Sequence, residues 1–263
     1  MGRAYGFHRS MDHLGAIVGP LVAFGLLALL GERLRTIFLL AAVPGLVSVL
    51  TLILWVSEVQ ADPAVSSAKP RLASHMDGRL KLFLLIVTLF TLGNSSDAFL
   101  LLRAEETGIE VAQLPLLWML LHLVKAMTGV PAGILSDLRG RRGAIIIGWL
   151  VYALAYLGFG AASQAWQIWL LFAFYGLYFG LTEGVERALI ADLVPVERQA
   201  SAFGLYHFCI GIAALPSSLL MGYLYQRFGA GPAFTVGASL AALSALLLAT
   251  LPLITAIQHG KTA

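Results

Sequence analysis

The chain is a succession of long apolar runs joined by short polar connections. A membrane-spanning helix needs roughly 20 mainly apolar residues. Polar and apolar residues do not alternate within these runs as they would in the strands of a membrane β-barrel. The pattern therefore predicts an all-α, polytopic membrane protein with eight transmembrane helices, at about 10–31, 36–57, 81–103, 112–135, 143–162, 167–193, 201–226 and 231–257.

Composition agrees with this pattern. Of the 263 residues, 59% are hydrophobic and 12% are charged, and the mean hydropathy is +0.85. These values exclude an ordinary soluble domain. The net charge of +3 requires no nucleic-acid partner, because basic residues near helix ends are what membrane topology needs. We expect the lipid bilayer to be the main partner.

Little in the sequence points to an enzyme. The single cysteine, Cys209, lies in an apolar run and gives neither a disulfide framework nor a metal site. No glycine loop precedes a Lys-Ser/Thr pair, so we do not expect ATP to drive this chain. No metal-ligand cluster or catalytic triad stands out, and we expect no enzyme activity, no metal and no cofactor.

Basic residues predict the orientation in the membrane. If the N-terminus is cytoplasmic, the outer side holds only Arg33, Arg35, Arg103 and Arg227. Lysine and arginine are enriched in cytoplasmic loops. Both termini are therefore expected in the cytoplasm, together with Arg3, Arg9, Lys69, Arg71, Arg79, Lys81, Arg139, Arg141, Arg142, Arg198 and Lys261.

One connection, at 58–80, is longer than the others and rich in Asp, Ser and Pro. Such a composition is typical of a linker between helical bundles. The sequence thus predicts two helices within 1–57, a cytoplasmic linker at 58–80 and a six-helix bundle at 81–263.

A charged segment stands between the fourth and fifth apolar runs and contains Gly133, Leu135, Asp137, Gly140, Arg141 and Arg142. At these positions it resembles the signature loop of the major facilitator superfamily of transporters, G-x-L-S/A-D-R/K-x-G-R-R/K. Leu138 departs from that pattern, which has a basic residue there, and Arg139 next to it would direct its charge differently. A plain basic connection is the alternative.

The resemblance implies a twelve-helix fold built from repeated bundles. The segment Arg3–His8, which opens the first apolar run, is echoed by Ser201–Tyr206, which opens the seventh. By this resemblance the chain corresponds to helices five to twelve. The signature loop then joins helices eight and nine, and the first four helices are missing, as in a fragment or one part of a longer chain.

Small residues in the first apolar run also resemble a family motif. Gly15, Gly19 and Pro20 match the first half of the fifth-helix motif of the family's antiporters, whereas Ala23 and Phe24 replace its final glycines. This half match favours efflux. Ordinary close helix packing explains the same small residues equally well.

The third apolar run ends in a polar cluster that contains Asn94 and Asp97. Glycine, asparagine and serine together can unwind a helix locally, and broken helices often form transporter sites. Burying a charge inside a bilayer costs free energy, so an ionisable residue at that depth indicates a function. Asp97 is therefore a candidate proton carrier. The alternative is that Asp97 lies close enough to the surface to be solvated.

His122 and Lys125 lie three residues apart in the fourth run, so they share a helix face. Lys125 is too deep to reach water easily and should enter a cavity or pair with an acid. It could attract an anionic substrate, or it could form a structural ion pair with Asp97 or Glu183. His122 has the simpler interpretation of a hydrogen-bonded interior histidine.

Three charged residues lie in the sixth run. Glu183 and Arg187 are four apart and can pair along the helix, and Glu183 is the deeper candidate for proton coupling. Glu186 and Arg187 are nearer the cytoplasmic end, within expected reach of the signature loop. The resemblance implies a gating role for Gly133, Asp137, Gly140, Arg141, Arg142, Glu186 and Arg187.

Two functional hypotheses follow. The first is a secondary active transporter of a small molecule, coupled to protons and directed to efflux, which we expect in the cell membrane, here the bacterial inner membrane. The second is a non-transporting membrane fragment or scaffold that needs a partner chain. The sequence does not name the substrate, because one fold carries many. Aromatic residues such as Tyr175 and Tyr178 could line a cavity.

Overall fold

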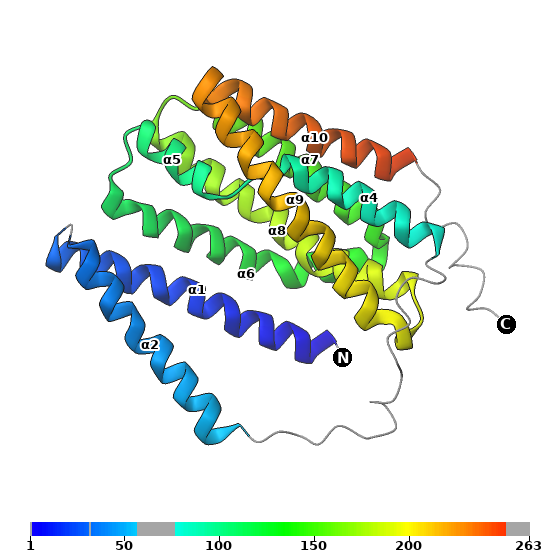
Figure 1. The fold of residues 1–263 in the computed structure, drawn as a ribbon, viewed down its shortest axis with the longest axis horizontal. Helices are drawn as coiled ribbons and strands as arrows, with labels where there is room; N and C mark the ends of the chain where they lie inside the picture. The colour runs from blue at the N-terminus through cyan, green and yellow to red at the C-terminus, as the bar shows by residue number, and fades with distance from the viewer. Residues whose placement is uncertain (1, 32, 57–76, 251–263) are drawn as a thin grey trace.

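The computed structural model describes residues 2–31, 33–56 and 77–250, with the backbone alone for 2–11, 13, 14 and 139. All regular structure in these ranges is helical (Figure 1). Seven helical stretches in the described part are long and apolar enough to cross a membrane, and Gly15–Leu30 is a shorter apolar stretch. The prediction of an all-α polytopic membrane protein is confirmed.

The first two helices form a hairpin beside the rest of the chain (Figure 1). Helix α1 (Gly2–Leu30) packs on α6, whereas α2 (Leu34–Trp55) has no buried residue. A Cβ atom added to Gly15 or Gly19 would meet no heavy atom of the described residues within 4 Å. Their expected role in helix packing therefore stays a prediction.

The third apolar run is broken, as its polar cluster predicted. Helix α4 (Gly78–Gly93) ends where the cluster begins, and α5 (Ala98–Glu106) starts directly after Asp97. The side chain of Asp77 caps α4 by accepting a 3.1 Å hydrogen bond from the backbone N–H of Arg79. The expected linker at 58–80 thus ends in helix at Gly78, and its residues 58–76 lie outside the described ranges.

The remaining helices follow in close succession. A short 3-10 turn (Val111–Gln113) leads into α6 (Leu114–Arg139), and another (Val196–Arg198) precedes α9. The signature segment, expected as a loop, is helical up to Arg139, and only Gly140, with φ of +94°, breaks the chain between α6 and α7. The other helices are α7 (Arg141–Ala161), α8 (Ala165–Leu193), α9 (Gln199–Phe228) and α10 (Ala230–Thr250).

The core lies among α4, α6, α7, α8, α9 and α10. Gly93 lets α4 approach α10, since an added Cβ there would lie 2.7 Å from the carbonyl oxygen of Gly237. Gly180 lets α8 approach α6 in the same way, at 2.1 Å from Oγ1 of Thr128. Large aromatic side chains fill the space between the helices: Phe83, Trp149, Tyr152, Tyr156, Phe159, Phe172, Tyr175 and Phe234.

Candidate functional site at the α4–α5 break

Two tyrosines of α7 hold the beginning of the α4–α5 break. The hydroxyl of Tyr152 donates a 2.9 Å hydrogen bond to the carbonyl oxygen of Gly93. One turn further, the hydroxyl of Tyr156 lies 3.3 Å from Oγ of Ser95. Both rings are fully buried and stack on each other, with centroids 4.2 Å apart.

Two tyrosines of α8 hold the rest of the break. The amide of Asn94 donates to the hydroxyl of Tyr178 at 3.4 Å. The hydroxyl of Tyr175 donates to Oδ1 of Asp97 at 2.7 Å. We call Tyr152, Tyr156, Tyr175 and Tyr178 together the tyrosine cluster.

The tyrosine cluster solves a problem that the break creates. Where a helix stops inside a membrane, backbone N–H and C=O groups lose their hydrogen-bond partners. Each unpaired group costs on the order of several kcal/mol. At the break the carbonyl of Gly93 is paired with Tyr152, and the N–H of Ser96 donates to Oγ of Ser218 on α9 at 3.3 Å. Non-helical backbone is therefore stable here because other helices supply its hydrogen bonds.

A half-buried ion pair lies next to the tyrosine cluster. Nζ of Lys125 is 3.9 Å from Oε2 of Glu183 and 3.8 Å from the centroid of the Phe179 ring. Phe179 in turn contacts the rings of Tyr175 and Tyr178, at centroid distances of 5.2 and 4.7 Å. The break, the tyrosine cluster and the Lys125–Glu183 pair thus form one contiguous site.

Several site residues predicted from the sequence meet in this region. The ion pair of Lys125 with Glu183, one of the alternatives left open by the sequence, is present. His122, one turn before Lys125, lies with its ring 5.7 Å from that of Trp118 on the same helix.

Glu186 differs from the expectation that it reaches the signature segment. It is buried, and its two carboxylate oxygens accept hydrogen bonds from Nε1 of Trp149 at 3.0 Å and from the hydroxyl of Tyr206 at 2.6 Å. These partners lie on α7 and α9, so Glu186 joins three helices within the core. Arg187, the next residue, is exposed.

The acid that contacts the signature segment is Asp192, near the end of α8. The guanidinium of Arg141 donates to Oδ2 of Asp192 and lies 3.2 Å from Oδ1 of Asp137. Arg142 donates to the backbone carbonyls of Leu248, at 2.7 Å, and Ala249. These carbonyls belong to the last described turn of α10. The segment therefore ties α6, α7, α8 and α10 together at one end of the bundle.

A second charged network lies at the opposite end of α7. Arg103 of α5 donates to the carbonyls of Phe159, at 3.1 Å, and Ala162, and pairs with Glu106 at 2.9 Å. Glu106 also accepts a 2.7 Å hydrogen bond from the hydroxyl of Tyr225 on α9. The segment beyond the break is thereby anchored to α7 and α9.

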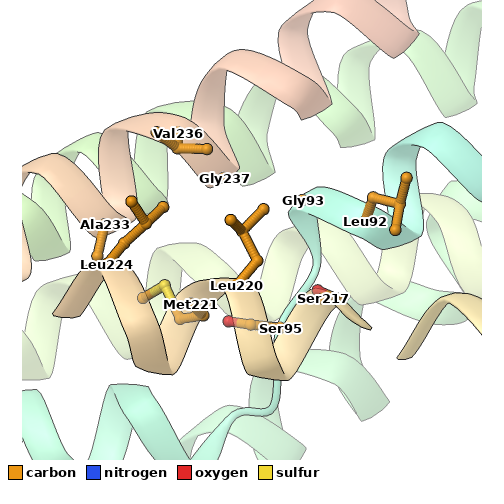
Figure 2. A pocket seen from close by; sticks show the side chains of 10 residues that line it. All are labelled: Leu92, Gly93, Ser95, Ser217, Leu220, Met221, Leu224, Ala233, Val236 and Gly237. Carbon is orange, nitrogen blue, oxygen red and sulfur yellow. The ribbon is translucent and has the colours of Figure 1, made fainter. Parts of the chain in front are cut away.

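A small pocket adjoins the break on the side of α9 and α10 (Figure 2). Its empty space of about 190 Å³ includes open solvent, so the enclosed part is smaller still. Ser95 and Ser217 contribute its hydroxyl groups, and the buried Oγ of Ser217 has no hydrogen-bond partner among the described protein atoms. The pocket is separate from the Lys125–Glu183 pair.

Sequence reasoning missed Tyr152, Tyr156 and Asp192. The signal for the tyrosines is their spacing, because residues four apart on α7 share one helix face, as do Tyr175 and Tyr178 on α8. Their partners lie on another helix and cannot be read from spacing. For Asp192 the sequence showed only that it is the last acidic residue of its helix, which does not identify Arg141 as its partner.

Comparison with known proteins identifies the family. Residues 82–262 match the sequence profile described as Major Facilitator Superfamily. An uncharacterized MFS-type transporter of Methanocaldococcus jannaschii, MJ1317, is 34% identical over 94% of this chain and 63% of its own length. An uncharacterized Mycobacterium tuberculosis protein, Rv2265, is 22% identical over 100% of this chain and 64% of its own length.

A more distant likeness covers about half of the chain. The multidrug resistance protein MdtG of Proteus mirabilis is 31% identical over 54% of this chain and 36% of its own length. The chain thus spans somewhat less than two thirds of the length of the relatives that match it throughout. By its profile match and its archaeal relative, the chain belongs to the major facilitator superfamily of membrane transporters.

Proposed function

We propose that the chain acts in a secondary active transporter of small molecules, alone or as part of a longer protein. The observation that carries this proposal is the α4–α5 break, where non-helical backbone is held by the tyrosine cluster beside the Lys125–Glu183 pair. Such discontinuous helices with charged residues at membrane depth are where transporters bind substrate and coupling ions.

Proton coupling through Asp97 or Glu183 is the second part of the proposal. Asp97 accepts a hydrogen bond from a fully buried tyrosine, and Glu183 faces the ammonium of Lys125. Protonation of either acid would weaken a contact between helices, so proton binding and helix movement are linked at this site. Tyr175 and Phe179 connect the two acids through ring contacts.

Gating, direction and topology complete the proposal. The Asp137–Arg141–Asp192 contacts would hold one end of the bundle closed and break when it opens.

Two observations support efflux. Gly15, Gly19 and Pro20 resemble the antiporter motif, and the MdtG relative is named a multidrug resistance protein. The basic residues support cytoplasmic termini, with 58–80 linking two bundles in the cell membrane.

The test uses the protein as produced from its own gene, in cells depleted of their own efflux pumps. A panel of labelled small molecules is added, a pH gradient is imposed, and accumulation is measured for Asp97→Asn, Glu183→Gln and wild type. Glu110→Gln is the matched control, because Glu110 is exposed between α5 and α6. Gradient-dependent transport that is lost in either test variant and kept in the control supports the proposal.

Two other results count against it. If both test variants transport with unchanged dependence on the gradient, neither acid is a proton carrier. If the wild type transports no compound in the panel, the result favours the alternative of a non-transporting scaffold. The observation that favours that alternative is that the described part of the chain buries no residue of α2.

A further inference from the structure

The pocket between the break, α9 and α10 has a buried hydroxyl group in its wall. Ser217 of α9 is 1% exposed, and its Oγ has no hydrogen-bond partner among the described protein atoms. Other serines find a partner within their own helix: Ser239 and Ser244 each donate at 2.8 Å to the carbonyl four residues earlier. Because an unpaired buried hydroxyl is costly, Ser217 is suited to bind something in the pocket.

Two further polar groups belong to residues of the same pocket. Ser95 of the break is 6% exposed, and its hydroxyl, 3.3 Å from that of Tyr156, can form additional hydrogen bonds. Leu92 also lines the pocket. In an uninterrupted helix its carbonyl would accept from the N–H of Ser96, but that N–H donates to Ser218 instead. Figure 2 shows Ser217 on α9 and Ser95 on the break around the one pocket.

The size of the pocket limits what it can hold. Its enclosed part has room for on the order of one water molecule. The rest of its wall is mainly apolar and includes Leu220, Leu224 and Val236. A cavity that is apolar throughout stays dry, whereas one with two to four polar partners and enough room holds water. This pocket is of the second kind.

We propose that the pocket binds one ordered water molecule, which bridges Ser217 of α9 to the α4–α5 break. Buried waters typically make about three hydrogen bonds, and the hydroxyls of Ser217 and Ser95 with the carbonyl of Leu92 supply that number. Helix α9 then holds the break at two adjacent residues, directly through Ser218 and through water at Ser217. The water site goes beyond the transport function proposed above and does not rest on it.

The first test locates the water. In X-ray radiolysis of the purified protein in detergent, hydroxyl radicals formed from a bound water oxidise the side chains beside it. Met221 lines the pocket and is 4% exposed, and its thioether is readily oxidised. We expect oxidation of Met221 in the wild type and its loss in Ser217→Val, which puts methyl groups in place of the hydroxyl.

Ser239→Val is the matched control, because Ser239 is an exposed serine that does not line the pocket. Met221 should be oxidised in this control as it is in the wild type. Equal oxidation of Met221 in Ser217→Val and the wild type, at the same X-ray dose and with both proteins folded by size exclusion, would overturn the proposal. So would a wild type in which Met221 is not oxidised.

The second test uses the sign of a stability change. If the Ser217 hydroxyl binds water, Ser217→Ala removes a hydrogen bond and should lower the thermal unfolding temperature relative to Ser239→Ala, which also gains helix propensity. If the pocket is dry, Ser217→Ala removes an unpaired buried hydroxyl and should raise that temperature. If the Ser217 hydroxyl turns to the carbonyl of Ala213, the two variants should unfold alike. A raised or equal temperature therefore contradicts the water site.

The two tests do not depend on the same variant. Should Ser217→Val not fold, oxidation of Met221 in the wild type and the sign of the Ser217→Ala change still decide, and the proposal needs both. Neither result bears on transport, because the Asp97 and Glu183 contacts lie outside the pocket.

Discussion

The hydroxyl of Tyr175 donates a 2.7 Å hydrogen bond to Oδ1 of Asp97, the residue that directly precedes α5. This contact joins a helix of the core, α8, to the start of the segment beyond the break. It makes the only acid of the break (residues 93–97) part of the aromatic core. The proposed proton carrier is therefore also a structural contact between two helices.

Loss of the Tyr175 hydroxyl should destabilise the fold and uncouple Asp97. Hydrogen bonds to charged groups contribute about 1.5–3 kcal/mol, so Tyr175→Phe should lower the thermal unfolding temperature in detergent. Asp97→Asn should lower the unfolding temperature less in the Tyr175→Phe variant than in the wild type, because the two residues share one hydrogen bond. Tyr223→Phe is the control, since Tyr223 is 63% exposed. Strictly additive effects would show that the contact contributes nothing.

A methyl group at Gly93 should separate α4 from α10. Its Cβ would lie 2.7 Å from the carbonyl oxygen of Gly237 and 2.8 Å from Cβ of Leu240. Overpacking of this kind costs about 1–3 kcal/mol, measurable as a lower unfolding temperature for Gly93→Ala. Gly211→Ala, where nothing lies within 4 Å of the new Cβ, should instead be neutral or slightly stabilising, as alanine favours helix. Equal effects of the two substitutions would refute the close approach.

Glu186→Gln should be more damaging to stability than Glu183→Gln. An ionised carboxylate accepts at both oxygens, whereas a glutamine amide accepts at one and donates at the other. One of the two donors, Trp149 Nε1 or the Tyr206 hydroxyl, would then be buried without a partner, at a cost of about 1–3 kcal/mol. Unfolding followed by tryptophan fluorescence compares the two variants. A larger loss in Glu183→Gln would contradict the geometry.

The Arg141–Asp192 contact should respond to exchange of its charges. Arg141→Glu places two acids, Asp192 and Asp137, against a third and should abolish gated transport in the cell assay. Adding Asp192→Arg restores an attractive pair across the same two helices and should recover part of the activity. Recovery that is equally good with Asp192→Ala would mean that the ion pair itself is unimportant.

The spans were predictable because their signal is local. Twenty apolar residues without alternation specify a membrane helix whatever its neighbours, and Asn94 with its small neighbours marked the break. The signature segment was recognised but its conformation was not: α6 runs through Asp137 to Arg139, and only Gly140 turns. Polarity suggested a loop there, while the hydrogen bonds of the helix continue beyond the apolar region.

The partners of the charged residues were less predictable, because they depend on packing between helices. The sequence offered Glu183 two partners, Arg187 on its own helix and Lys125 on another, and spacing alone could not choose between them; the structure places Glu183 against Lys125 of α6. Depth suggested that Glu186 reaches the signature segment, but rotation of α8 turns it to Trp149 and Tyr206.

The most direct measurement of the central claim is substrate flux in proteoliposomes that contain the protein as produced from its own gene. An imposed pH gradient should drive flux of the compound with the largest signal in cells, and both Asp97→Asn and Glu183→Gln should be compared with Glu110→Gln. We predict gradient-driven flux in the wild type and the Glu110 control, and its loss in Asp97→Asn, Glu183→Gln or both. Equal flux in all four proteins, or none in the wild type, would contradict a proton-coupled site at the α4–α5 break.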